Sequence, residues 1–202
     1  PGGFVGVDVF FVISGFLISG IILGKLKDGT FTFTDFYARR IRRIFPALAL
    51  VLAATVVVGW LTMLPADFRR LGLQIAAGAG FASNLLFWRQ AGEYFATAAE
   101  LKPLLHLWSL GVEEQYYVLW PLLLFLLRGD RRHRILWLIV GLAAASFATS
   151  VYLVERRPIS AFYLPQSRFW ELMTGSLIAY VHVHGHGLRG LPVVSLTRVC
   201  QP

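Results

Sequence analysis

The run of residues 106–121 (HLWSLGVEEQYYVLWP) places a histidine and two adjacent glutamates at the mouth of an apolar stretch. An acidic or basic side chain at the centre of a membrane helix costs roughly 2.5 to 3.5 kcal/mol, so such groups usually face a bundle interior or an aqueous cavity. A carboxyl group in that low-dielectric setting is a competent general acid or base near neutral pH. The other interpretation is a helix start, where the helix dipole favours acids.

Adjacent acids on a helix point about 100° apart, so we expect one of the two to face a cavity. We expect this acid to be Glu113 rather than Glu114. His106 precedes them in a predicted interfacial turn, where a lone histidine is more often a hydrogen-bonded structural residue than a catalyst. The spacing of His106, Ser109 and Glu113 does not indicate a serine triad.

A basic run at residues 39–43 (RRIRR) suits a different chemistry. Arg39, Arg40, Arg42 and Arg43 form two Arg-x-x-Arg pairs, each about one helical turn apart. Guanidinium forks bind phosphate oxygens bidentately, so these pairs suit a pyrophosphate-bearing substrate. An orientation signal that touches anionic lipid head groups explains the same arginines, and charge alone favours that alternative.

Three further charges lie near the ends of apolar segments. Asp8 stands in the first segment, and Arg168 and Glu171 stand three residues apart at the start of the last. Because isolated charges are costly there, we expect these side chains to pair across helices. Buried charges of this kind also fit a non-catalytic permease or scaffold that passes ions or sugars, which is the competing functional class.

The histidines near the end of the chain do not indicate a metal site. His182, His184 and His186 alternate along the sequence, a spacing that could bind a metal, but they belong to an atypical polar tail. The single cysteine, Cys200, leaves no internal disulfide. We therefore expect no metal in this chain.

Composition places these residues in a membrane. The 202 residues are 56% hydrophobic with a mean hydropathy of +0.63, and 15% are charged, against roughly 25% in a soluble domain. The predicted class is an all-α, polytopic transmembrane helix bundle of about five to six segments. The net charge of +8 collects at the ends of apolar segments, which argues against a nucleic-acid partner. The candidate segments are residues 4–23, 44–64, 71–88, 116–127, 135–153 and 169–182.

The basic loops predict the orientation of the bundle. Six Lys/Arg lie within residues 25–43 and four within residues 128–134, so both loops are predicted to be cytoplasmic. Three candidate segments between these loops leave an odd number of crossings, so one of them must be irregular. We assign residues 71–88 as a re-entrant segment because glycine and alanine suit backbone that lines a cavity, which places residues 106–114 on the outer side.

A short basic helix is predicted before the second span. Its apolar positions recur every three to four residues, which suits an interfacial helix with its arginines facing water. These positions are Phe36, Tyr37, Ile41, Ile44 and Phe45. Thr34 or Asp35 is the expected cap, and Pro46 is expected to begin the next span. Earlier in the chain, Gly6, Gly15 and Gly20 are spaced for close helix packing.

Four blocks of the chain resemble a known family. They are residues 3–18 (GFVGVDVFFVISGFLI), 36–46 (FYARRIRRIFP), 108–117 (WSLGVEEQYY) and 162–172 (FYLPQSRFWEL). In this order they closely resemble the acyltransferase-3 membrane family, the O-acetylases of lipopolysaccharide and peptidoglycan. The resemblance implies a multi-pass enzyme of the bacterial inner membrane. It would move an acyl group, usually acetyl, from acyl-CoA to a hydroxyl of an envelope carbohydrate.

The resemblance also implies roles for individual residues. Coenzyme A phosphates would bind Arg39, Arg40, Arg42 and Arg43. The catalytic cavity would be lined by Asp8, Glu113 and Arg168. Acetyl-CoA is then the donor substrate, and no metal is involved.

The chain departs from the family pattern at both ends. Family members begin with a further helix that carries an arginine and a histidine to which catalysis is attributed, and Pro1 stands just after the place of that helix. Residues 1–182 are therefore expected to be a partial acyltransferase domain, and residues 183–202 a disordered tail. We expect the 202 residues alone to have no transferase activity, which an assay of acetyl release from acetyl-CoA would test.

Overall fold

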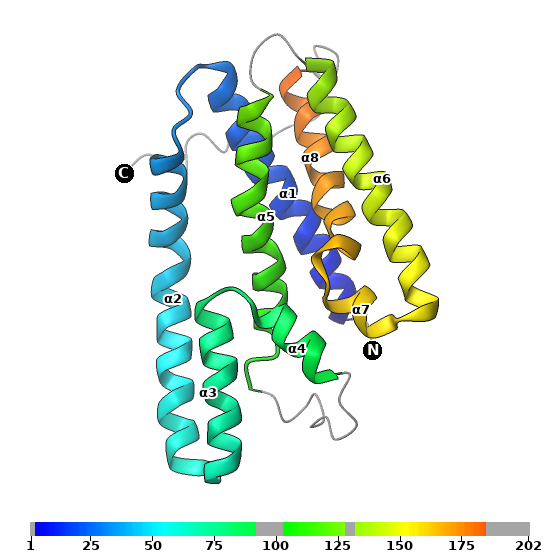
Figure 1. Ribbon diagram of the computed structural model, residues 1–202. Helices are drawn as coiled ribbons and strands as arrows, with labels where there is room; N and C mark the ends of the chain where they lie inside the picture. Colours follow the sequence, from blue (N-terminus) through cyan, green and yellow to red (C-terminus); the bar gives the residue numbers. More distant parts are fainter. Residues whose placement is uncertain (1–2, 92–102, 128–131, 185–202) are drawn as a thin grey trace.

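The computed structural model describes residues 3–91, 103–127 and 132–184, and in these ranges the chain is helical without any strand (Figure 1). The all-α class is therefore confirmed. The helices are α1 (Gly3–Lys27), α2 (Phe33–Thr62), α3 (Pro65–Ala79), α4 (Ser83–Ala91), α5 (Leu107–Leu126), α6 (Arg132–Arg156), α7 (Pro158–Tyr163) and α8 (Phe169–His184), with a 3-10 helix, η2 (Pro165–Ser167), before α8.

Within the described ranges, α1, α2 and α6 are long and apolar enough to cross a membrane. Large apolar side chains project outward from α2 and α6, among them Leu61 at 76% exposure and Trp137 at 71%. Exposed apolar area on this scale marks contact with another apolar phase, here lipid. α5 and α8, which contain two more of the predicted segments, run beside these helices and carry the buried acids Glu113 and Glu171.

The two ends of the bundle differ in charge. α1 ends at Lys25 and Lys27, and α6 begins near Arg134 at the same end, which we call the basic end (Figure 1). The start of α1, the end of α6 and α7 lie at the opposite end, which we call the distal end. This arrangement agrees with the predicted placement of both basic loops on one side.

The predicted short basic helix is wrong in its boundaries. α2 continues from Phe33 to Thr62 and contains Pro46 instead of beginning at it. The cap is Thr32, whose hydroxyl accepts a hydrogen bond from the Asp35 backbone N–H at 3.4 Å. A proline inside a helix removes one hydrogen bond and crowds the preceding turn, but it is tolerated in a membrane-spanning helix, because the backbone there must keep its hydrogen bonds within the segment. The arginine run is consequently part of the long helix α2, which packs mainly on α3 and buries Phe36, Leu48, Leu52 and Gly59.

The α3–α4 turn interrupts the helix within residues 71–88, the segment predicted to be irregular. α3 returns along α2 and ends at Ala79, and α4 then leads back toward the distal end (Figure 1). Between them, Phe81 adopts a left-handed conformation with φ of 53°, which is uncommon for a bulky residue. The segment from α3 to α4 therefore enters and leaves on the same side of the bundle. The number of membrane crossings between the two basic loops is then even, as the predicted orientation requires.

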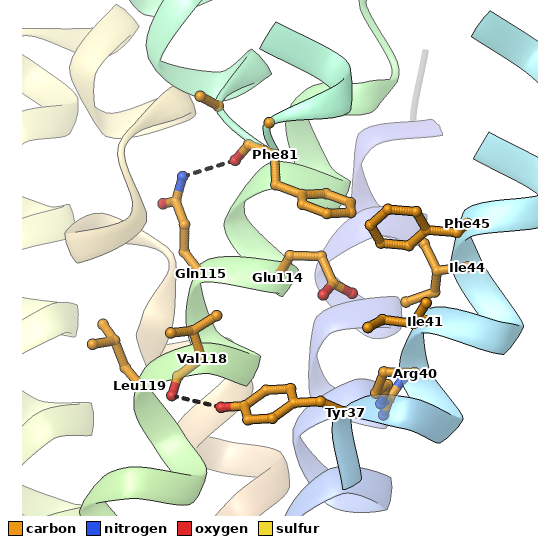
Figure 2. Close-up of a pocket in the computed structure, with 12 residues that line it drawn as sticks. Tyr37, Arg40, Ile41, Ile44, Phe45, Phe81, Glu114, Gln115, Val118 and Leu119 are labelled. Carbon is orange, nitrogen blue, oxygen red and sulfur yellow. Dashed lines mark hydrogen bonds between the residues drawn. The ribbon is translucent and has the colours of Figure 1, made fainter. Parts of the chain in front are cut away.

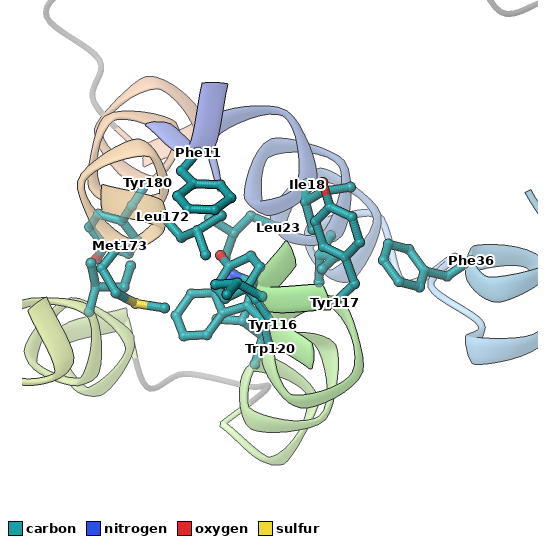
Figure 3. Packing of buried hydrophobic residues seen from close by; sticks show 14 of the residues in the cluster. Phe11, Ile18, Leu23, Phe36, Tyr116, Tyr117, Trp120, Leu172, Met173 and Tyr180 are labelled. Atoms are coloured by element: carbon teal, nitrogen blue, oxygen red, sulfur yellow. The ribbon is translucent and has the colours of Figure 1, made fainter. Parts of the chain in front are cut away.

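The core forms where α1, α5 and α8 meet (Figure 3). α1 and α8 make the most extensive helix contact in the described chain. At their crossing, a Cβ added to Gly15 would overlap the Leu172 carbonyl, and one added to Gly175 would overlap the Val12 carbonyl. The two backbones can therefore meet only through glycine. The predicted small-residue packing is confirmed at Gly15 but is wrong for Gly6 and Gly20, where an added Cβ meets no atom within 4 Å.

Candidate functional site

The two adjacent glutamates face different neighbours. Glu113 is 5% exposed and turns toward α1, where its Oε1 atom accepts hydrogen bonds from the Ser14 and Tyr117 hydroxyls. Glu114 instead lines a cavity between α2 and α5 (Figure 2). The prediction that Glu113 would be the cavity-facing acid is wrong, because the small Ser14 side chain on α1 leaves room for the Glu113 carboxylate to bond there.

This hollow, which we call the α2–α5 cavity, has a volume of about 550 Å³ and a largely apolar wall. It is lined by Tyr37, Arg40, Ile41, Ile44 and Phe45 of α2, by Gly80, Phe81 and Ala82 of the α3–α4 turn, and by Glu114, Gln115, Val118 and Leu119 of α5. The α2 residues repeat at helical spacing and form one face. The periodic apolar face predicted for this part of α2 thus faces α5.

Arg40 is the one arginine of the basic run that lines the cavity. Its guanidinium carbon lies 4.1 Å from the centre of the Tyr117 ring and 6.0 Å from that of Phe36, distances that fit cation–π contact. Arg39, Arg42 and Arg43 are exposed on other faces of α2. The four arginines therefore do not converge on one ligand group.

A continuous set of contacts connects Arg40 with the buried acid. Glu113 accepts the Tyr117 hydroxyl proton in a hydrogen bond, and the Tyr117 ring carries the Arg40 guanidinium on its face. Arg40 and Glu114 also line the same cavity, from α2 and α5. The Glu114 Oε1 atom is buried and has no hydrogen-bond partner among the described residues. A buried polar atom without a partner is costly, and a bound ligand would satisfy it.

Two amides of neighbouring helices hold the α3–α4 turn in place. Gln115 donates to the Phe81 carbonyl at 3.2 Å and to the Asn84 side-chain oxygen at 3.0 Å. Asn84 donates in turn to the Tyr163 carbonyl of α7 at 3.3 Å. Neither Phe81 nor Gln115 was predicted to have a role in the site. The glycines before Phe81 and the amide of Asn84 after it were the available signal.

Asp8, Arg168 and Glu171 form a separate network toward the distal end. Arg168 Nη1 lies 3.0 Å from Asp8 Oδ1 and 2.9 Å from Glu171 Oε1, and Arg168 Nε donates to the Phe162 carbonyl at 3.3 Å. The predicted pairing across helices is confirmed. None of the three lines the α2–α5 cavity, and Glu113 bonds elsewhere. The sequence-based grouping of Asp8, Glu113 and Arg168 is thus divided between two networks.

The histidines lie apart from both networks. His106 precedes α5, and its backbone carbonyl accepts the Ser109 hydroxyl at 3.2 Å, a bond that does not involve the imidazole. His182 lies 6.4 Å from the Phe16 ring, and His184 stacks on Tyr180. The third member of the predicted histidine cluster, residue 186, and the cysteine at 200 lie outside the described residues, as does the predicted tail beyond α8.

Comparison with known proteins connects this geometry to a family. The acyltransferase domain family matches residues 2–196. An uncharacterized protein of Haemophilus influenzae is 39% identical over 184 residues, which are 87% of this chain and 74% of that protein. The peptidoglycan O-acetyltransferase OatA of Listeria monocytogenes is 35% identical over 185 residues, which are 89% of this chain. The chain spans 30% of the length of OatA.

No solved structure matches the chain. The family match nevertheless covers almost every residue, including the helices that carry the α2–α5 cavity and the Arg168 network. The chain therefore belongs to the acyltransferase-3 family of membrane proteins.

Proposed function

We propose that this chain is the donor-binding part of a bacterial inner-membrane acyltransferase that moves an acetyl group from acetyl-CoA to a hydroxyl of an envelope carbohydrate. The observation that carries the proposal is the α2–α5 cavity, which is lined by Arg40 and by Glu114, whose buried Oε1 atom has no hydrogen-bond partner among the described residues. The name of the Listeria relative, a peptidoglycan O-acetyltransferase, supports a glycan acceptor. A peptidoglycan or lipopolysaccharide sugar is the acceptor class that we infer.

Arg40 is positioned to bind a phosphate of the donor. The edge of its planar guanidinium can donate two parallel hydrogen bonds to phosphate oxygens. The Tyr117 ring packs against the face of the guanidinium and holds it in place. Glu113 acts through Tyr117 in this arrangement, as a positioning residue. The apolar side chains Ile41 and Val118 suit the uncharged arm of a thioester. Arg39, Arg42 and Arg43 would attract the anionic donor from outside the cavity.

The transfer itself needs a proton acceptor. The sugar hydroxyl oxygen forms a bond to the thioester carbonyl carbon, and the carbon–sulfur bond breaks. The sugar hydroxyl loses its proton to a base, and the coenzyme A thiolate that leaves takes up a proton. Glu114 lines the donor cavity and has an unused acceptor oxygen, so it fits the role of a general base. Catalytic roles for Asp8, Glu113 and Arg168 remain predictions from the family resemblance.

Replacing Arg40 by alanine is expected to weaken acetyl-CoA binding by about tenfold or more, because a charge-assisted hydrogen bond contributes about 1.5 to 3 kcal/mol. Arg40→Lys is expected to weaken binding as well, since a point charge cannot replace a fork. The measurement is isothermal titration calorimetry of acetyl-CoA on the detergent-purified chain.

Arg42→Ala is the matched control, because this exposed arginine lies about 200° around α2 from Arg40. It removes the same charge from the same helix and is expected to change the affinity by less than about threefold. Equal losses for Arg40→Ala and Arg42→Ala would contradict the assignment of the cavity. Absence of any acetyl-CoA binding by the unmodified chain would favour the permease alternative.

A further inference from the structure

A second hollow lies at the distal end of the bundle, away from the α2–α5 cavity. It has a volume of about 500 Å³ and a strongly basic lining. We call it the distal arginine pocket; its lining residues are Trp88, Arg89, Arg156, Arg157, Pro158, Ile159 and Ser160. None of the described residues that line this pocket is acidic, and no ion pair among the described residues involves the three arginines.

Hydrogen bonds fasten the walls of this pocket. Trp88 of α4 donates its indole N–H to the Ser160 hydroxyl of α7 at 3.0 Å. Arg156 rests on the Tyr152 ring, with its guanidinium carbon 4.5 Å from the ring centre, and donates to the Tyr152 hydroxyl at 3.1 Å. A serine hydroxyl is both acceptor and donor, so Ser160 has a proton to offer to an anion. The pocket thus combines guanidinium forks with a neutral donor on a fixed frame.

The position of the arginines argues that they serve a ligand. The distal end is opposite the basic loops, and the positive-inside rule depletes arginine from short segments on that side. The dipole at the end of α6 favours one cation such as Arg156, and the dipole at the end of α4 favours Arg89. A helix dipole does not explain Arg157, because this residue caps the start of α7. Arg157 nevertheless lines the same pocket as Arg89 and Arg156. Like charges brought together repel unless an anion lies between them.

We propose that the distal arginine pocket binds a phosphate group on the side of the membrane opposite the basic loops. Arginine forks match the oxygens of a phosphate bidentately, and Ser160 adds a further donor. The phosphate is carried by a sugar phosphate or by a lipid head group, and both present the same oxygens to the pocket. This site is additional to the donor cavity and does not depend on the function proposed for it.

The experiment uses the purified chain in a neutral detergent with Arg40→Ala present, so that the α2–α5 cavity does not contribute. Glucose 1-phosphate is compared with glucose by calorimetry, and phosphatidic acid with diacylglycerol by native mass spectrometry. The phosphate-bearing probe of at least one pair is expected to bind more tightly than its neutral partner. Binding of phosphatidic acid alone identifies a site for a lipid head group. Binding of both glucose 1-phosphate and phosphatidic acid shows that the pocket recognises the phosphate and not the group attached to it.

Arg157→Gln is expected to weaken the phosphate-dependent binding about tenfold, since one fork is lost. Arg134→Gln is the matched control, because Arg134 is exposed on α6 at the basic end. Arg89→Gln, on a different helix, repeats the test if Arg157→Gln does not fold. The proposal is overturned if neither phosphate probe is preferred over its neutral partner, or if Arg134→Gln weakens binding as much as the pocket variants.

Discussion

Replacing Gly175 by alanine is expected to cost about 3 kcal/mol or more of the free energy of unfolding, enough to prevent α8 from packing on α1. The new Cβ would overlap the Val12 carbonyl and crowd the Phe16 backbone N–H. Backbone atoms of a packed helix have no rotamer by which to move away, so the helices must separate. Gly15→Ala is expected to act in the same way through the Leu172 carbonyl.

Gly20→Ala is the control for this prediction. It lies on the same helix α1, but an added Cβ there meets no atom within 4 Å. Alanine in a helix interior is about 0.5 to 1 kcal/mol better than glycine, so this variant is expected to be unchanged or slightly more stable. The measurement is the SDS mole fraction at the midpoint of unfolding, followed by tryptophan fluorescence. Equal midpoints for Gly175→Ala and Gly20→Ala would contradict the proposed close crossing.

The long helices and the irregular segment at residues 71–88 could be predicted from the sequence, because the physical reasons for both act locally. Long apolar runs require internally satisfied backbone in a membrane, which indicated the segments that became α1, α2 and α6. The glycine and alanine content of residues 71–88 indicated irregular backbone in this segment, and the interruption between its two helices occurs at Phe81. The boundary predicted at Pro46 was wrong, because a local rule for helix starts does not include the need of a membrane-spanning segment to keep its backbone hydrogen bonds within one helix.

The composition of the candidate site could be predicted only in part. The sequence identified Arg40 and the pair of glutamates, but which glutamate faces the cavity depends on how α5 is rotated against α1. That rotation is set by the partner residue Ser14, which is 99 positions away in sequence. The arginines of the distal pocket were missed because Arg89 and Arg157 are distant in sequence and become neighbours only when α4 packs on α7.

Removing the positive charge of Arg168 is expected to destabilise the bundle by about 3 to 5 kcal/mol, because breaking a buried ion pair leaves its partner without a countercharge. The partner is Glu171, which is 1% exposed and lies 2.9 Å from Arg168. Arg168→Met keeps the length of the side chain and removes the charge. Asp8→Asn is expected to cost less than Arg168→Met, since the Asp8 side chain is 37% exposed and the Arg168 guanidinium keeps Glu171 as its counter-ion.

The double variant Arg168→Met with Glu171→Leu separates a structural role of Arg168 from a catalytic one. A buried pair replaced by apolar side chains of similar volume is often neutral in stability, so the double variant is expected to recover most of what Arg168→Met loses. The midpoint of SDS unfolding measures this recovery. If Arg168 is also catalytic, as the family resemblance predicts, acetyl transfer by the protein containing this chain will stay low in the stable double variant. If the double variant is no more stable than Arg168→Met, the exposed partner Asp8 and the Phe162 carbonyl, rather than Glu171, carry the contribution of Arg168.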